Sequence, residues 1–230
     1  MLEKIAQIKQ EFTGTTFSFY EIRDLARALE STRFIYTKNT RLSLRKEVSV
    51  RVIDDGEDLL TIAEEAKSCL YQAHFSWERQ VKACNRFLED QGALYLAIEA
   101  GRDSGYVALY AGQQCDTDES VLFEDHLRTG KKALYHPDMK AVVALALEQL
   151  GLAENSFLYV PFGELDYFEG ERSHFVKQGS EYFKKAFPPE FYHGERPYCL
   201  WPSFARCSEL LDKARNTEYQ TTATIASLQC

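Results

Sequence analysis

The stretch that most constrains the fold of this chain is LYLAIEAGRDSGYVALY, which begins at Leu94 and ends at Tyr110. Its first and last parts alternate in the manner of β-strands, and the turn GRDS between them predicts a hairpin. Apolar side chains occupy both faces of each strand, so both faces need cover from other elements. The two strands are therefore predicted in the middle of the sheet of an α/β fold, and not on the solvent-exposed face of a β-sandwich.

Strand and helix patterns continue on either side of this hairpin. The clearest helix is predicted after Pro137, where apolar residues recur at i, i+3, i+4, i+7, i+8 and i+11 from Met139 until Gly151 ends the helix. Ser76 is a candidate N-cap for the helix that precedes the hairpin. In chain order the other expected elements are a strand at 48–53, helices at 58–70 and 77–90, strands at 121–127 and 156–162, a helix at 179–187, a strand at 198–204 and a helix at 208–215.

These patterns divide the chain into three parts. Residues 1–47 are interpreted as an N-terminal helix-strand extension, with helical spacing over 20–30, a short strand at 33–37 and a polar, basic connector. Residues 48–215 are interpreted as the α/β domain. Residues 216–230 contain little that would hold them against a core, and a disordered tail is predicted there.

Charge and composition narrow the functional classes. A net charge of −8, from 27 Lys and Arg against 35 Asp and Glu, argues against a broad basic surface, so no nucleic-acid partner is expected. No apolar run approaches the roughly 20 residues of a membrane helix, and a cytoplasmic location is expected. The six cysteines lack the paired spacing of zinc sites, so no metal is predicted and the thiols are expected to be reduced. Cys69 and Cys84 fall on the apolar stripes of predicted helices, where we expect them to be packed.

The order of elements from residue 48 to residue 204, together with three local stretches, resembles the GNAT superfamily of N-acyltransferases. VSVRVIDDGEDLLTIAEEA is similar to the opening strand and first helix of that family, and ALYLAIEAGRDSGYVALYAG is similar to its second and third strands. SEYFKKAF resembles a late helix of the family, with Tyr182 and Phe187 at its aromatic positions. The resemblance covers about two-thirds of the chain and implies a central mixed, mostly antiparallel sheet with helices on both faces. It also implies a slot for a thioester, which we expect between the strands at 106–111 and 157–162, beside the start of the helix at 138.

The same resemblance implies an acyl-CoA donor whose pyrophosphate is held by a Gln/Arg-x-x-Gly-x-Gly/Ala loop before a helix. The matching stretch here is RTGKKA, with Arg128, Gly130 and Lys131 as the candidate donor-binding residues. A lysine stands at the first glycine position of the pattern, where the backbone has to approach the phosphates closely. Either the charges of Lys131 and Lys132 hold the donor in another way, or coenzyme A is not the ligand and the stretch is a basic surface turn.

Acyl transfer to an amine requires a base for the amine proton and an acid for the departing thiolate. The resemblance implies Tyr182 as the acid and Glu124, with Asp125 beside it, as the base. Plainer interpretations stay open for both positions. Tyr182 is one of 13 tyrosines and can pack its ring against the sheet, and the two carboxylates can be a solvated pair at the end of a strand.

Two classes of function follow from these observations. The first is a divergent acyltransferase that moves an acyl group from an acyl-CoA-type thioester to an amine of a small molecule, peptide or protein. The second is a non-catalytic α/β interaction module in which the aromatic-rich residues 157–201 bind a partner. Aromatic side chains beside Arg and Glu suit an interface and an apolar substrate groove equally well, so composition does not choose between the two.

Overall fold

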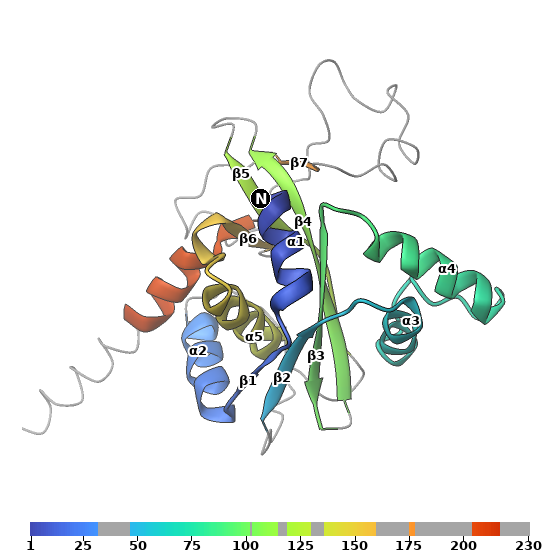
Figure 1. Ribbon diagram of the computed structural model, residues 1–230. Coiled ribbons are helices and arrows are strands. Elements are labelled where there is room, and N and C mark those ends of the chain that lie inside the picture. Colours follow the sequence, from blue (N-terminus) through green and yellow to red (C-terminus); the bar gives the residue numbers. More distant parts are fainter. Residues whose placement is uncertain are drawn as a thin grey trace, which may run out of the picture.

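The computed structural model of the chain describes residues 1–31, 47–101, 103–114, 119–129, 136–159, 175–177 and 204–216. Within these residues, helices cover both faces of a mixed sheet of eight strands (Figure 1). The predicted fold class, α/β with a mixed and mostly antiparallel sheet, is confirmed. The elements are α1 (Leu2–Glu11), β1 (Thr15–Phe17), α2 (Phe19–Ser31), β2 (Val48–Val52), α3 (Gly56–Glu65), α4 (Trp77–Leu88), β3 (Ala93–Ala100), β4 (Asp103–Gln114), β5 (Ser120–Thr129), α5 (His136–Gln149), the short 3-10 helix η1 (Ala153–Asn155), β6 (Ser156–Tyr159), β7 (Phe175–Lys177), β8 (Phe204–Arg206) and a helix at 207–216.

The strands follow the order β1, β2, β3, β4, β5, β6, β8, and β7 pairs with β4. All pairs are antiparallel except β5 with β6, which is parallel because the chain returns through α5. The hairpin of β3 and β4 lies in the middle of this order, as predicted, with Leu94 opposite Leu109 and Leu96 opposite Val107.

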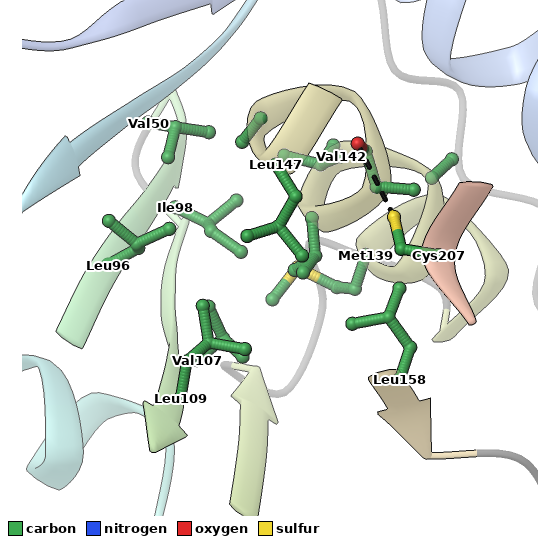
Figure 2. Packing of buried hydrophobic residues seen from close by; sticks show 14 of the residues in the cluster. Val50, Leu96, Ile98, Val107, Leu109, Met139, Val142, Leu147, Leu158 and Cys207 are labelled. Carbon is green, nitrogen blue, oxygen red and sulfur yellow. Dashed lines mark hydrogen bonds between the residues drawn. The ribbon is translucent and has the colours of Figure 1, made fainter. Parts of the chain in front are cut away.

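Alternation along the central strands sends side chains into two hydrophobic clusters, one on each face of the sheet. Leu94, Leu96 and Ile98 join the first cluster, to which α1, α2, α5 and the helix at 207–216 contribute. Figure 2 shows part of this cluster, with α5 packed over the strands. Tyr95 and Ala97 join the second cluster, to which α3 and α4 contribute. Because burying a large apolar side chain stabilises a fold by about 1.5–3 kcal/mol, covering both faces of this hairpin is a main source of stability.

The helix α5 is buried around most of its circumference. It lies between the sheet and α2, which it contacts along its length (Figure 1). Eight of its residues are at most 1% exposed, namely Met139, Lys140, Ala141, Val142, Val143, Ala144, Ala146 and Leu147. A helix covered on several sides has no broad polar face, so a charged residue on it requires a partner within the fold.

The N-terminal segment of α1, β1 and α2 packs onto the rest of the sheet. β1 pairs with β2, and Ile5 and Ile22 are buried in the first cluster. The ammonium of Lys9 donates hydrogen bonds to the carbonyls of Leu88 at 2.9 Å and Asp90 at 3.0 Å, where α4 ends. The carbonyl of Leu88 is among the last four of α4, which have no partner inside the helix, so α1 supplies a donor to the end of α4.

The helix α3 is shorter than its apolar pattern predicts. It ends at Glu65, and Lys67 follows with a positive φ of 49°, which stops the helix. Cys69 therefore lies in a turn and is exposed, so the prediction that it packs on a helix is wrong. Cys84 on α4 is buried, as predicted.

Some predicted elements fall outside the described residues, namely the strand at 33–37, the helix at 179–187 and the tail from residue 217 onward. Among the helices that are described, none combines the length and the apolar character needed to cross a membrane.

Candidate functional site

The strands β5 and β6 are parallel neighbours whose pairing is short. Their pairing joins residues 122–123 to 156–157 and goes no further in the part of the chain that the structure describes. β5 continues beside β4 as far as Thr129. We call this place the fork and define it as residues 124–129 of β5 and 158–159 of β6.

The fork differs from the slot that the sequence led us to expect. The strands at 106–111 and 157–162 were predicted to enclose an opening, but β5 lies between β4 and β6 in the sheet. The parallel strands with the short pairing are β5 and β6, and α5 packs on one face of the sheet there. The expectation was wrong because the predicted strand at 121–127 pairs with β4 along its whole length.

β5 is irregular at the fork. Glu124 is opposite Leu109 of β4, whereas His126 is opposite the adjacent Ala108, so Asp125 is an extra residue in the strand. Such a bulge disturbs the alternation of side chains and bends the strand. As a result Glu124 is only 4% exposed, while its neighbour Asp125 is exposed to solvent.

Glu124 forms a buried ion pair with Lys140 of α5. The lysine side chain is 0% exposed, so both charges are removed from water. Burial lowers the pKa of Lys140, and the charge and hydrogen bond of Glu124 oppose this shift. Because this carboxylate is buried and already accepts a hydrogen bond from Lys140, it is poorly placed to meet a substrate amine.

Cys207 is a third ionisable group close to this ion pair. Burial raises the pKa of its thiol to about 12, and the charges of Glu148 and Glu154 add to the shift. Its sulfur lies 3.8 Å from the carbonyl oxygen of Ala144 on α5, the contact drawn as a dashed line in Figure 2. The thiol is therefore protonated at neutral pH and is not a nucleophile there.

Three tyrosines gather on the opposite face of the sheet, on β3 and β4. The hydroxyls of Tyr95 and Tyr110 lie 3.0 Å apart, and the hydroxyl of Tyr106 lies 2.5 Å from Ser68 Oγ. Burial raises the pKa of both Tyr95 and Tyr106, and for Tyr95 the neighbouring Tyr110 and the charge of Asp125 add to the effect. The hydroxyls of Tyr95 and Tyr106 therefore stay protonated over the physiological range and can serve as hydrogen-bond donors.

Arg128 lies on the same face as these tyrosines, opposite Tyr106 in the strand register, and its side chain is exposed. Its positive charge lowers the pKa of Tyr106, against the larger effect of burial. This face of the fork thus carries a cation at Arg128 and an exposed carboxylate at Asp125, above a layer of tyrosine hydroxyls.

The structure separates the two predicted site residues that it describes. Glu124 and Arg128 both lie on β5, but Glu124 faces α5 and Arg128 faces the tyrosines. Gly130, Lys131 and Tyr182 lie outside the described residues, so their roles stay predictions. The alternative of a solvated carboxylate pair holds for Asp125 and not for Glu124.

Lys140 is a residue of the fork that the pattern-based reasoning misses. A signal for it is present in the sequence, because it is the one charged residue in the run MKAVVALAL. A charge in such a run has to find a counter-charge if the helix is buried. What the sequence does not contain is the identity of that partner, which depends on how β5 and α5 pack.

Comparison of the chain with models of known protein families and with curated protein sequences gives no match.

Proposed function

We propose that the chain is an acyltransferase that moves an acyl group from an acyl-CoA-type thioester to an amine of a small molecule, peptide or protein. The observation that carries the proposal is the fork, where the pairing of two parallel strands ends beside the helix that follows one of them. An extended thioester can lie between strands that part, and backbone N–H groups can polarise its carbonyl. The resemblance of the stretches between residues 48 and 204 to N-acyltransferases supports the same reaction.

In this proposal Asp125 is the base and Tyr182 is the acid. The amine nitrogen attacks the thioester carbonyl, the C–N bond forms and the C–S bond breaks. Asp125 accepts the amine proton, and Tyr182 donates a proton to the departing thiolate. We assign the base to Asp125 because it is exposed on the bulge, whereas Glu124 is buried against Lys140. Glu124 then has a positioning role, since its ion pair ties β5 to α5.

The phosphates of the donor are assigned to the end of β5 and the stretch that follows it. Arg128 is exposed there, and Gly130 and Lys131 come next in the sequence. Attraction between exposed charges and phosphate is screened by salt. Donor affinity should therefore fall as the ionic strength rises.

Thermal unfolding with coenzyme A and acetyl-coenzyme A tests the proposal. A ligand at 100 times its dissociation constant adds about 2.7 kcal/mol to the free energy of unfolding, which corresponds to roughly 5–10 °C for a chain of this size. Arg128→Glu should reduce the shift at low salt. Arg27→Glu is the matched control, because Arg27 is also exposed but lies on α2.

Turnover measurements distinguish the roles of the two acids. Asp125→Asn should abolish most turnover while stabilisation by acetyl-coenzyme A persists, whereas Glu124→Gln should first lower the stability of the protein. If neither acetyl- nor longer-chain coenzyme A raises the melting temperature, the proposal fails and the non-catalytic interaction module is favoured.

A further inference from the structure

The helix α4 lies on the face of the sheet opposite α5 (Figure 1). This helix and the turn before it carry an exposed aromatic and basic surface. We call it the α4 surface, and it consists of His74, Phe75, Arg79, Lys82 and Arg86. Phe75 is 38% exposed, and few large apolar side chains in the described part of the chain are as exposed. Exposed aromatics beside arginines are the side chains that contribute most to binding energy at protein interfaces.

The cations of the α4 surface form a continuous row. Arg79, Lys82 and Arg86 follow one another at i, i+3 and i+7, so they share one side of the helix over about 10 Å. The same three side chains line a hollow of about 530 Å³, together with Ser76, Glu78 and Ala83. Glu78 is the single acidic residue among these lining residues, and it already pairs with Lys82 at 2.9 Å. The hollow is therefore positively charged.

The two arginines of this row differ from the paired arginines of the fold. Arg51, Arg206 and Arg215 each form a salt bridge with a carboxylate, at 2.6, 3.0 and 2.7 Å. Within the residues that the structure describes, neither Arg79 nor Arg86 has a carboxylate partner. The guanidinium of Arg79 lies 4.6 Å from the centre of the Phe75 ring. Both guanidinium groups can therefore donate hydrogen bonds to a carboxylate of another molecule, in the bidentate geometry that arginine favours.

The turn that presents the aromatic residues is held in place from below. Gln80 is 5% exposed, its Nε2 donates to the carbonyl of Phe75 at 3.1 Å, and its Oε1 accepts from the backbone N–H of Gln72 at 2.6 Å. The His74 and Phe75 rings also pack together, with centroids 4.2 Å apart. A surface that is already ordered loses less conformational entropy when it binds a partner.

We propose that the α4 surface docks an acidic segment of a partner protein, with carboxylates on Arg79 and Arg86 and an apolar side chain against Phe75. The charge around the surface favours a short acidic segment over a nucleic acid. The helix α3, which packs against α4, carries four acidic residues, and Glu89 and Asp90 follow the end of α4. A polyanion that extended beyond the row would meet these negative charges and the overall charge of −8. This inference does not depend on the proposed acyl transfer.

Fluorescence polarisation with three labelled probes tests the inference. The first is a 12-residue peptide with six glutamates and two leucines, the second is the same peptide with every glutamate replaced by glutamine, and the third is a 12-nucleotide oligothymidylate. The full chain should bind the acidic peptide at low salt, with affinity at least tenfold above that for the other two probes. Binding should weaken as salt is added, because the contacts are between exposed charges.

Charge reversal locates the binding site. Arg86→Glu should weaken binding of the acidic peptide at least tenfold, and Phe75→Ala should weaken it several-fold without changing its salt dependence. Arg27→Glu on α2 is the matched control, because it changes the net charge by the same amount, and it should leave the affinity within twofold of the original. Arg79→Gln is a second variant in case Arg86→Glu alters the melting temperature.

Three results would overturn the inference. One is the lack of saturable binding of the acidic peptide by the unmodified chain. Another is equal weakening by Arg86→Glu and Arg27→Glu, which would mean that net charge alone determines binding. The third is tighter binding of the oligothymidylate, which would assign the surface to a nucleic acid instead.

Discussion

The ion pair between Glu124 and Lys140 provides the sharpest test of the packing described above. Their side chains are 4% and 0% exposed, so neither charge is solvated when its partner is removed. Removing one partner of a buried pair costs about 3–5 kcal/mol, whereas replacing both by apolar residues of similar volume is often neutral or stabilising. We therefore expect Lys140→Met and Glu124→Gln each to lower the free energy of unfolding by about 3–5 kcal/mol, or roughly 6–20 °C in melting temperature. The double variant Glu124→Leu/Lys140→Met should recover most of this loss.

The stability of the Glu124→Gln variant should depend on pH. In Glu124→Gln the buried lysine loses the carboxylate that opposes its desolvation, so the pKa of Lys140 falls further below its usual value. The unfolded chain then binds more protons than the folded chain between that lowered pKa and about 10.4, and stability rises with pH.

Urea unfolding followed by circular dichroism at pH 5, 7 and 9 measures both effects. The control is the exposed pair of Arg215 and Glu148, whose side chains are 53% and 40% exposed and whose loss should cost no more than about 1 kcal/mol. Glu148 also lies on α5, so the two pairs differ mainly in burial. If the Lys140 and Glu124 variants lose no more than the control and show no dependence on pH, the two side chains are not buried together and our account of the fork is wrong.

Two further predictions concern the helix pair and the buried thiols. Gly56→Ala should lower the free energy of unfolding by about 1–3 kcal/mol through overpacking, because a Cβ there would lie 2.5 Å from Oδ1 of Asn85. A loss below about 0.5 kcal/mol in urea unfolding would show that α3 and α4 adjust to the added methyl group. Burial raises the pKa of Cys84 to about 11 and that of Cys207 to about 12, from 9.0. The thiols of the unfolded chain therefore ionise first, and the free energy of unfolding should fall as the pH rises from about 9 to 12, by up to about 1.4 kcal/mol per pH unit for each thiol. The lowered pKa of Lys140 makes an opposing contribution. A free energy of unfolding that stays constant over this range would contradict the burial of both thiols.

The elements near the hairpin could be predicted because their signals are local. Alternation between Leu94 and Tyr110 sets which side chains lie on each face, and the apolar character of both faces demands cover on both sides. The helix after Pro137 could be predicted in the same way, because its apolar residues recur with the period of a helix. The α/β class and the central place of the hairpin follow from these patterns without knowledge of any long-range contact.

The end of α3 and the role of the N-terminal segment were harder to predict. The apolar pattern of α3 continues to Leu70, but the chain turns at Lys67 and exposes Cys69. The N-terminal segment contains an ordinary amphipathic helix whose partner is not apparent in its own sequence. Its position against the sheet and α4 depends on contacts such as that of Lys9 with the carbonyl of Leu88, 79 positions away in the chain.

The site at the fork depended on tertiary structure more than any other part. Glu124 and Asp125 are adjacent carboxylates, and the sequence alone assigns them the same environment. A bulge in β5 separates them, because Glu124 pairs with Leu109 of β4 and His126 with the adjacent Ala108, which leaves Asp125 without a place in the ladder. The packing of α5 then places Lys140 against Glu124. Periodicity is a local property that the sequence carries by itself, whereas strand register and the choice of a buried counter-charge are set by elements that meet only when the chain is folded.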